Sequence, residues 1–319
     1  MSILKYSPII ILISYFFTSF LVKTSINLDY PNSRSSHIRP TPSSGGLAFI
    51  STTLIFIIID ILLNKISYAN SIFLLCLPIA LVGFVDDKLD LNKKIRYLVQ
   101  LIVVVSLIFA NLNSNQSLVY ELSNFRFLFP IIFTLLIFLG TGLINLINFM
   151  DGIDGLVAGC FVISTFFIGL NQNHLIFYLS AALIGFLISN WYPAKIFMGD
   201  VGSTFLGSVL VANLFQSENI IDFLNIGLLN LPLIADAFIC LSVRCVKGEN
   251  IFLPHKKHLY QRLTENGWSH SKVSLIYLIS TLILGLSVTL GNIIITVILS
   301  FVILILGLTL NNNHAAKFI

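Results

Sequence analysis

The sequence predicts an all-α integral membrane protein, a polytopic bundle of ten or eleven transmembrane helices that forms a single domain over residues 1–319. Three observations predict this fold: 56% of the 319 residues are hydrophobic and 10% are charged, the mean hydropathy is +0.94, and apolar runs recur along the whole chain. Soluble domains carry about 25% charged residues. The composition therefore excludes a soluble enzyme, a nucleic-acid-binding module, a disordered chain and a disulfide scaffold.

Eleven apolar runs are long enough, or nearly long enough, to cross a bilayer. They lie at residues 3–22, 45–63, 70–85, 95–111, 127–144, 155–170, 174–190, 203–217, 222–245, 273–290 and 293–310. Gly291 and Asn292 alone separate the last two, so ten spans is the alternative. Because the first run is long and lacks a small-residue cleavage site, we expect a retained helix rather than a signal peptide.

The basic residues predict the orientation of the bundle. If the connections alternate sides, fourteen of the eighteen Lys and Arg residues fall on one side and three on the other. Such a bias marks the cytoplasmic side of a membrane protein. We therefore expect cytoplasmic loops near residues 23–44, 86–94, 145–154, 191–202 and 246–272.

Among the fourteen acidic residues, a group of aspartates at the ends of spans falls in connections on this cytoplasmic side: Asp86, Asp87, Asp90, Asp151, Asp154 and Asp200. A carboxylate near the membrane boundary is costly unless it is paired, solvated or bound to a metal. A single Asp could simply cap a helix or solvate a turn. Six of them at the ends of four spans favour a shared polar site.

The first acidic segment is GFVDDKLDLNKKIRYLVQ, residues 83–100, in which Asp86, Asp87 and Asp90 precede Lys94 and Arg96. Mutual neutralisation of acids and bases would explain this pattern. A divalent cation with bound phosphates explains it equally well, because Mg²⁺ takes one or two carboxylates and fills its remaining positions with water and phosphate oxygens. Lys and Arg would then offset the phosphate charge.

Two further segments contain acids beside glycines. Amides and acids recur every three residues in NLINFMDGIDGLVAG, residues 145–159, as Asn145, Asn148, Asp151 and Asp154. An apolar helix gains nothing from this run, although a glycine-rich turn between helices is the alternative. Asp200 lies in GDVGS, residues 199–203. An Asp there could be a helix cap, but beside the other acids it is a metal-ligand candidate.

A basic loop follows in PHKKHLYQRL, residues 254–263, where His255 and His258 flank Lys256 and Lys257. Two His at this spacing could bind Zn²⁺, but the cations between them and the lack of a nearby third ligand argue against a zinc site. A cationic cradle for phosphate or pyrophosphate fits better. An ordinary positively charged cytoplasmic loop is the alternative.

The remaining polar and thiol groups carry weaker signals. Arg34, His37 and Arg39 form a basic segment before the second span, and Asp236 lies deep in the run at 222–245, where either a functional or a structural role is open. The cysteines, Cys76, Cys160, Cys240 and Cys245, form no CxxC pair and no Cys/His metal spacing. We expect them to be buried thiols.

Carboxylates suited to Mg²⁺, together with Lys, Arg and His for phosphates, indicate phosphoryl transfer at the inner membrane surface. The chain has no GxxxxGK[ST] sequence for ATP and no GxSxG nucleophile elbow. A secondary transporter is the main rival class, but it predicts acids near the bilayer midplane and two matching repeats. No internal repeat is evident, and the acids lie at one face.

These motifs resemble those of the polyprenyl-phosphate N-acetylhexosamine-1-phosphate transferases, a group within glycosyltransferase family 4. DDKLD at 86–90 looks like the DDxxD stretch of that family, NFMDGIDGL at 148–156 is nearly its NxxDGxDGL signature, and FMGDVGS at 197–203 is similar to its metal-binding loop. The resemblance covers roughly residues 31–263. It implies transfer of a sugar-1-phosphate from a UDP-N-acetylhexosamine to undecaprenyl phosphate, with release of UMP, in the bacterial inner membrane.

The resemblance also implies roles for individual residues. Asp86, Asp87 and Asp200 would be catalytic, with Asp200 and Asp87 on Mg²⁺ (Mn²⁺ is the alternative) and Asp86 or Asp87 activating the lipid phosphate. The substrate-binding residues would be Asn148, Asp151, Asp154, Lys94, His255 and His258. A homodimer and the choice between one displacement and two stay open.

One departure from the family pattern concerns the donor sugar. The last loop of the family is often HxHH or HHH, whereas this chain has His255, His258 and then Tyr260 and Gln261. That form looks like the O-antigen-initiating branch, whose donors carry a 6-deoxy sugar such as FucNAc or QuiNAc. The muramoyl-pentapeptide donor is disfavoured, and GlcNAc stays open.

Overall fold

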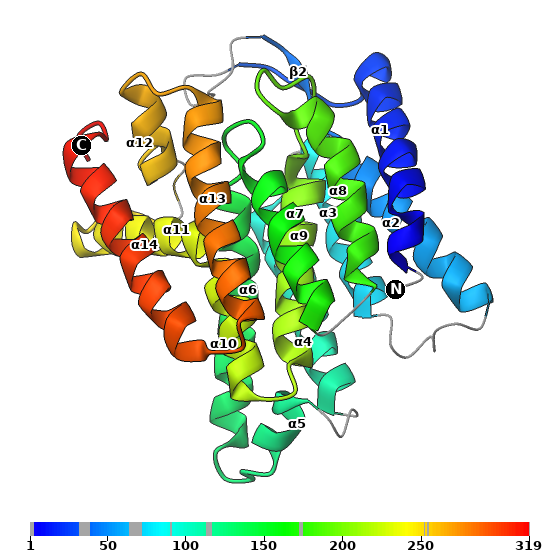
Figure 1. The fold of residues 1–319 in the computed structure, drawn as a ribbon, viewed down its shortest axis with the longest axis vertical. Helices are drawn as coiled ribbons and strands as arrows, with labels where there is room; N and C mark the ends of the chain where they lie inside the picture. Colours follow the sequence, from blue (N-terminus) through cyan, green and yellow to red (C-terminus); the bar gives the residue numbers. More distant parts are fainter. Residues whose placement is uncertain are drawn as a thin grey trace.

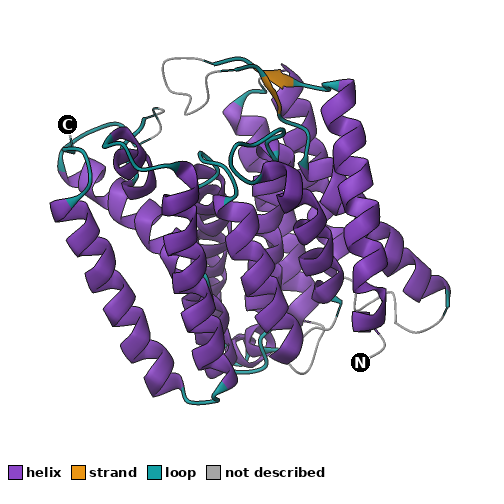
Figure 2. Cartoon of the chain, turned by 45° about the horizontal axis from the view of Figure 1, so that its top comes forward, coloured by secondary structure: helices purple, strands orange, loops and turns teal. Residues whose placement is uncertain are grey.

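The computed structural model describes residues 3–31, 39–63, 72–89, 91–112, 117–171, 175–251, 253 and 255–318. Within this part the chain is helical apart from loops and one short antiparallel hairpin, in which Leu28 pairs with Pro42 and Asp29 with Thr41 (Figure 1). Figure 2 shows the same predominance of helix around that single hairpin. The predicted all-α fold is confirmed. Arg34, His37 and Asp90 lie outside the described residues.

The elements follow one another in a simple order. The first half contains the 3₁₀ turn η1 (Ile3–Tyr6), α1 (Ser7–Thr24), β1 (Leu28–Asp29), β2 (Thr41–Pro42), α2 (Gly46–Leu62), the 3₁₀ turn η3 (Ile72–Cys76), α3 (Leu77–Leu89), α4 (Lys93–Leu112), α5 (Leu118–Ser123) and α6 (Phe129–Phe149). The second half contains α7 (Leu156–Asn171), α8 (Ile176–Asn190), α9 (Gly199–Gln216), α10 (Ile220–Leu229), α11 (Leu231–Val246), α12 (Leu259–Glu265), α13 (His270–Thr289) and α14 (Ile293–Asn313).

Local sequence signals set several of the helix starts. The side chains of Ser269 and Asn219 accept hydrogen bonds from backbone N–H groups in the first turns of α13 and α10, which satisfies donors that have no partner inside the helix. Pro130 stands at the start of α6, where its missing N–H is not needed. The apolar runs thus fold as helices whose ends are capped locally.

The apolar run at 222–245 does not form a single straight helix. The chain instead forms α10 and α11, which meet at an angle of 76°. Pro232 lies in the first turn of α11, and proline both removes a backbone donor and restricts the residue before it. Helix α11 consequently lies across the neighbouring helices (Figure 1).

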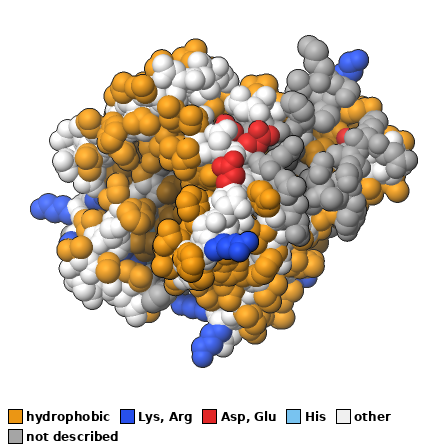
Figure 3. Space-filling view, turned by 90° about the horizontal axis from the view of Figure 1, so that it is seen from below, with side chains coloured by type: hydrophobic (Ala, Val, Ile, Leu, Met, Phe, Trp, Pro, Cys, Tyr) orange, Lys and Arg blue, Asp and Glu red, His pale blue; other side chains and the backbone are white. Residues whose placement is uncertain are grey.

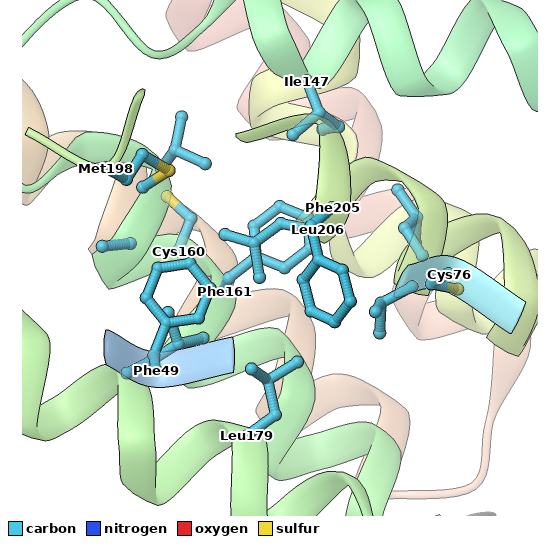
Figure 4. Packing of buried hydrophobic residues seen from close by; sticks show 14 of the residues in the cluster. Phe49, Cys76, Ile147, Cys160, Phe161, Leu179, Met198, Phe205 and Leu206 are labelled. Atoms are coloured by element: carbon cyan, nitrogen blue, oxygen red, sulfur yellow. The ribbon is translucent and has the colours of Figure 1, made fainter. Parts of the chain in front are cut away.

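Helix α9 is the centre of the bundle. Every residue from Val201 to Phe215 is buried, and α9 packs against α2, α3, α4 and α6. Phe205 and Leu206 lie in one apolar cluster with Phe49, Phe161 and Leu179 from other helices (Figure 4). A Cβ on Gly46 would meet Gly202 N at 2.5 Å, so the missing side chains let α2 and α9 touch backbone to backbone.

Five helices are long and apolar enough to cross a membrane, namely α1, α4, α6, α13 and α14, or six if α10 and α11 count as one bent span. Helices α2, α7 and α8 are apolar but shorter. Seen from the end opposite the hairpin, the visible surface is mainly hydrophobic with few charged side chains (Figure 3). The multi-pass membrane architecture is confirmed, whereas the count of ten or eleven spans stays a prediction.

Candidate active site

The carboxylate of Asp87 caps the start of helix α9. Asp200 N–H donates to Asp87 Oδ1 at 2.9 Å, and Val201 N–H donates to Asp87 Oδ2 at 3.3 Å. These donors belong to the positive end of the α9 dipole, which favours an anion. Asp87 and Asp200 come from distant parts of the sequence, and the structure brings them together as predicted.

Two glycines make this approach of α3 and α9 possible. A Cβ on Gly83, one turn before Asp87, would lie 2.6 Å from Asp200 O. Gly199 has φ +70°, and a Cβ there would lie 2.4 Å from Asp87 Oδ2. The left-handed turn at Gly199 therefore starts α9 directly against the carboxylate, at a position where other residues would be strained.

An arginine joins the other two predicted catalytic acids. Arg96 Nη1 lies 2.5 Å from Asp86 Oδ2, and Arg96 Nη2 lies 2.7 Å from Asp200 Oδ2. Asp86 Oδ1 also accepts a hydrogen bond from Leu91 N–H at 2.8 Å. The guanidinium thus supplies the positive charge that holds two carboxylates from α3 and α9 close together.

The end of α6 adds an amide and a further acid to this group. Ser203 Oγ–H donates to Asn148 Oδ1 at 2.5 Å, which fastens the end of α6 to the first turn of α9. Loss of hydration, with the nearby carboxylates of Asp200 and Asp154, raises the pKa of Asp151 to about 8. Asp151 is therefore part of a crowded acidic cluster, which we define as Asp86, Asp87, Asp151 and Asp200.

The acidic cluster suits a hard divalent cation. Mg²⁺ binds carboxylate, amide and water oxygens, and oxygens of all these protein types lie around Asp200. The guanidinium of Arg96 already occupies a position between two of the acids, which marks the place where positive charge is needed. The donor set therefore fits the predicted metal.

Asp154 faces a different surface, a cavity of about 730 Å³. Asp154 Oδ2 accepts from Ala194 N–H at 3.0 Å, and Asp154 Oδ1 lies 3.4 Å from His270 Nδ1. The cavity wall also contains cations and aromatic rings: Arg39, Lys195, Lys256, Tyr192, Phe197 and Trp268. Such a mixture can hold phosphates and stack on a planar ring.

The histidine loop is held by the intramembrane acid Asp236. Asp236 Oδ1 accepts from Leu259 N–H at 2.7 Å, and Asp236 Oδ2 accepts from Tyr260 N–H at 3.1 Å and from Tyr277 Oη–H at 2.8 Å. These bonds fix the start of α12 directly after His258. Asp236 therefore has the structural role that its sequence position left open.

Tyr260 ties the histidine loop to the acidic segment at the end of α6. Its hydroxyl donates to Phe149 O at 3.1 Å, and a Cβ on Gly152 would lie 2.1 Å from the same hydroxyl oxygen. His258 is buried beside Phe149, with ring centroids 6.4 Å apart. Burial, together with the charge of His258, Arg244 and Lys257, lowers the pKa of His255 to about 4.

The structure differs from the sequence-based expectations at several residues. Lys94 is exposed at the start of α4, and among the described residues the cation that contacts the acidic cluster is Arg96. His270 belongs to none of the sequence motifs, yet it lies in the cavity beside Asp154. Cys245 is exposed, which corrects the expectation of four buried thiols. The contacts of Arg96 and His270 depend on which helices pack together, and residue spacing in the sequence does not indicate this.

The family model described as glycosyl transferase family 4 matches residues 69–217, a range that includes the whole acidic cluster. A probable undecaprenyl-phosphate N-acetylglucosaminyl 1-phosphate transferase of Bacillus subtilis is 32% identical over 269 residues, which cover 79% of this chain and 74% of the relative. The chain belongs to glycosyl transferase family 4. The resemblance inferred from its motifs is confirmed.

Other members of glycosyl transferase family 4 are similarly related. An undecaprenyl-phosphate alpha-N-acetylglucosaminyl 1-phosphate transferase of Thermotoga maritima is 32% identical and covers 78% of both chains. A phospho-N-acetylmuramoyl-pentapeptide-transferase of Prochlorococcus marinus is 31% identical over 77% of this chain and 78% of the relative. The match to the family-4 model ends at residue 217, and the hydrogen bond from the Tyr260 hydroxyl to Phe149 O links the later histidine loop to that matched range.

Proposed function

We propose that this family-4 protein transfers N-acetylhexosamine-1-phosphate from a UDP-sugar to undecaprenyl phosphate, releasing UMP, at the cytoplasmic face of the bacterial inner membrane. The observation that carries the proposal is the convergence of α3, α4, α6 and α9 on Asp200, where acids, an amide and an arginine meet. Phosphoryl transfer is catalysed mainly by positioning and by neutralising charge. This cluster supplies both.

Asp87 and Asp200 are the proposed ligands of Mg²⁺, with Mn²⁺ as the alternative metal. When bound, such an ion neutralises phosphate oxygens and polarises the phosphorus that is attacked. Arg96 would keep Asp86 and Asp200 in place and offer a second positive charge to the phosphates. Asn148, held by Ser203, would orient the donor beside the cluster.

The donor nucleotide is proposed to occupy the cavity beside Asp154. Its carboxylate can accept from the N–H of a pyrimidine base, and Phe197 or Tyr192 offers a ring for stacking. Lys195 and Lys256 line the same cavity and would meet the diphosphate. His255 and His258, in the loop that Asp236 holds, would contact the pyrophosphate.

The acceptor phosphate is proposed to be activated by Asp86 or Asp87, as a base or through a covalent aspartyl-phosphate. In the first case one carboxylate accepts a proton from the lipid phosphate while the phosphate oxygen attacks the β-phosphorus of the donor and UMP leaves. Asp87 already accepts two backbone N–H bonds, which restrain its carboxylate. Asp86 forms an ion pair with Arg96 and a side-chain hydrogen bond with Asp200.

The donor sugar is the least constrained part of the proposal. The names of two relatives favour GlcNAc, whereas the His255 to Gln261 segment resembles sequences that use 6-deoxy-N-acetylhexosamines. A direct test incubates membranes containing the protein with undecaprenyl phosphate, Mg²⁺ and a panel of UDP-sugars. Mass spectrometry of the lipid fraction identifies the product, and UMP release measures the rate.

The expected product is one lipid-linked pyrophosphoryl N-acetylhexosamine, absent from membranes that carry Asp200→Asn. His258→Ala should impair the transfer while the protein still folds and inserts. Release of UMP without any lipid-linked sugar would refute the acceptor. A lipid product formed equally well in chelator-treated membranes would refute the metal.

A further inference from the structure

We propose that Cys240, His255 and His258 form a binding site for a thiophilic divalent cation, Zn²⁺ above all, and that occupation of this site inhibits the transfer. Binding of the ion stands by itself, whereas its inhibitory effect rests on the proposed function. The site is separate from the acidic cluster. It uses nitrogen and sulfur atoms, which the acidic cluster lacks.

The three side chains come from α11 and from the loop before α12. One ligand atom from each lies within 4.8 Å of the other two, and the rings of His255 and His258 are 4.9 Å apart between centroids. Ligands on a tetrahedral zinc ion are about 3.3 to 3.6 Å apart, given Zn–N and Zn–S bonds of about 2.0 and 2.3 Å. A shift of about 1 Å in the half-buried His255 would close the site.

One of the three side chains also carries a buried polar atom without a partner in the described part of the chain. Cys240 and His258 are each 3% exposed, and His258 Nδ1 has no hydrogen-bond partner among the described residues. A buried nitrogen without a partner is costly, and a metal ion would satisfy it. Asp236 Oδ1 lies 3.8 Å from that nitrogen, where it could become a fourth ligand or orient the ring.

The chemistry of the donors selects the ion. Thiolate and imidazole bind zinc strongly, whereas Mg²⁺ requires oxygen ligands. The Cys240 thiol must release its proton when the metal binds. Two features weaken binding relative to a structural zinc site: His255 Nδ1 accepts a bond from Lys257 N–H at 3.2 Å, and the cations Arg244 and Lys257 lie nearby. Reversible inhibition is therefore expected, and not a permanent cofactor.

An entry path leads to the thiol. A cavity of about 440 Å³ between α11, α13 and α14 is lined by Cys240, Asp236 and Lys257 among others. Cys240 lines this mainly apolar cavity, whereas His255 and His258 lie outside its wall. Once bound, the ion would hold His255 and His258 away from the donor pyrophosphate.

The decisive comparison uses two cysteines of the same helix. Cys240→Ser removes the proposed ligand, and Cys245→Ser removes the exposed thiol five residues later. In an assay with saturating Mg²⁺ and buffered Zn²⁺, we expect the half-inhibitory Zn²⁺ concentration to rise by more than about tenfold in Cys240→Ser, while activity without Zn²⁺ is unchanged. Cys245→Ser should behave as the wild type. Equal zinc sensitivity of Cys240→Ser and wild type would overturn the proposal.

A binding measurement separates this site from the enzymatic activity. Purified protein titrated with Co²⁺ in excess Mg²⁺ should develop a thiolate-to-cobalt charge-transfer band that is lost in Cys240→Ser and kept in Cys245→Ser. If the band forms and no sugar transfer is detected, the metal site holds and the proposed function fails. If transfer is detected but wild type shows no such band, the metal site fails and the function holds.

Discussion

Helices α9 and α14 are both apolar helices of similar length, yet they differ in burial, in packing and in whether they carry an acid of the acidic cluster. In α9 every residue from Val201 to Phe215 is buried, whereas in α14 the buried residues are Thr296 and Ser300 and most large apolar side chains are exposed. A helix that faces lipid keeps its polar atoms inside, and one in the centre needs small residues for close packing. High hydropathy therefore marks the helix with a lipid-facing surface, α14. Helix α9, which carries Asp200 of the acidic cluster, is less apolar.

The largest difference is expected at the first turn of α9. Asp200→Asn should lower the rate of sugar-phosphate transfer by at least about a hundredfold, because charge stabilisation by a metal is worth several kcal/mol. The measurement is UMP release at saturating Mg²⁺. Asp222→Asn in the first turn of α10 is the matched control and should keep the wild-type rate. An active Asp200→Asn protein would remove α9 from the site.

Glycine substitutions test the packing side of the comparison. A Cβ on Gly207 of α9 would lie 2.8 Å from Ile144 Cα, whereas Gly307 of α14 has nothing within 4 Å. Gly207→Ala should therefore destabilise the protein by about 1–3 kcal/mol through overpacking. Gly307→Ala should be neutral or stabilise it by up to about 1 kcal/mol through helix propensity. Thermal unfolding in detergent measures both, and equal effects would contradict the central position of α9.

The acidic cluster should make the stability of the protein depend on pH and on Mg²⁺. Helix α14 contains no acidic residue and should contribute no such dependence. The pKa of Asp151 is raised from 3.8 to about 8, so the folded protein holds this proton more tightly than the unfolded chain does. Without metal, stability should therefore fall as the pH rises from about 4 to about 8. Mg²⁺ binds the ionised carboxylates, so the stabilisation it confers should grow over the same range. A Mg²⁺ effect that is constant between pH 5 and pH 9 would contradict this.

The smallest expected effect is the difference in transfer rate between substitutions of two basic residues at the start of α4. Arg96→Ala removes two charged contacts to Asp86 and Asp200, and loss of such bonds corresponds to roughly a tenfold to hundredfold lower rate. Lys94→Ala, at an exposed position, should reduce the rate by less. Steady-state kinetics of both variants decides between them. A greater loss in Lys94→Ala would restore the phosphate contact that the sequence suggested for this lysine.

The sequence was most informative where one segment carries the signal by itself. Apolar runs predicted the helices, and the segments DDKLD, DGIDG and GDVGS together identified the members of the acidic cluster. Hydropathy is averaged over a window of residues and therefore did not predict the bend at Asn230. Pro232 in the same run does favour a break in the helix. The bridge made by Arg96 and the approach of Cys240 to His255 depend on which helices pack together. In particular, the third nitrogen or sulfur donor that the sequence lacked near His255 and His258 is close to them in space and distant in sequence.

The bend between α10 and α11 has a consequence for the surrounding lipid. Helix α10 has ten residues and α11 has sixteen, and the two helices meet at 76°. Together they extend about 20 Å along the axis of α10, which is less than the hydrocarbon thickness of about 30 Å. Exposed Phe238 and Val246 then face acyl chains that must shorten to meet them. We therefore expect the bilayer to thin along this edge of the protein. Under the proposed function, headgroups lowered in this way would bring the phosphate of the acceptor lipid sideways toward the carboxylates, within its own monolayer.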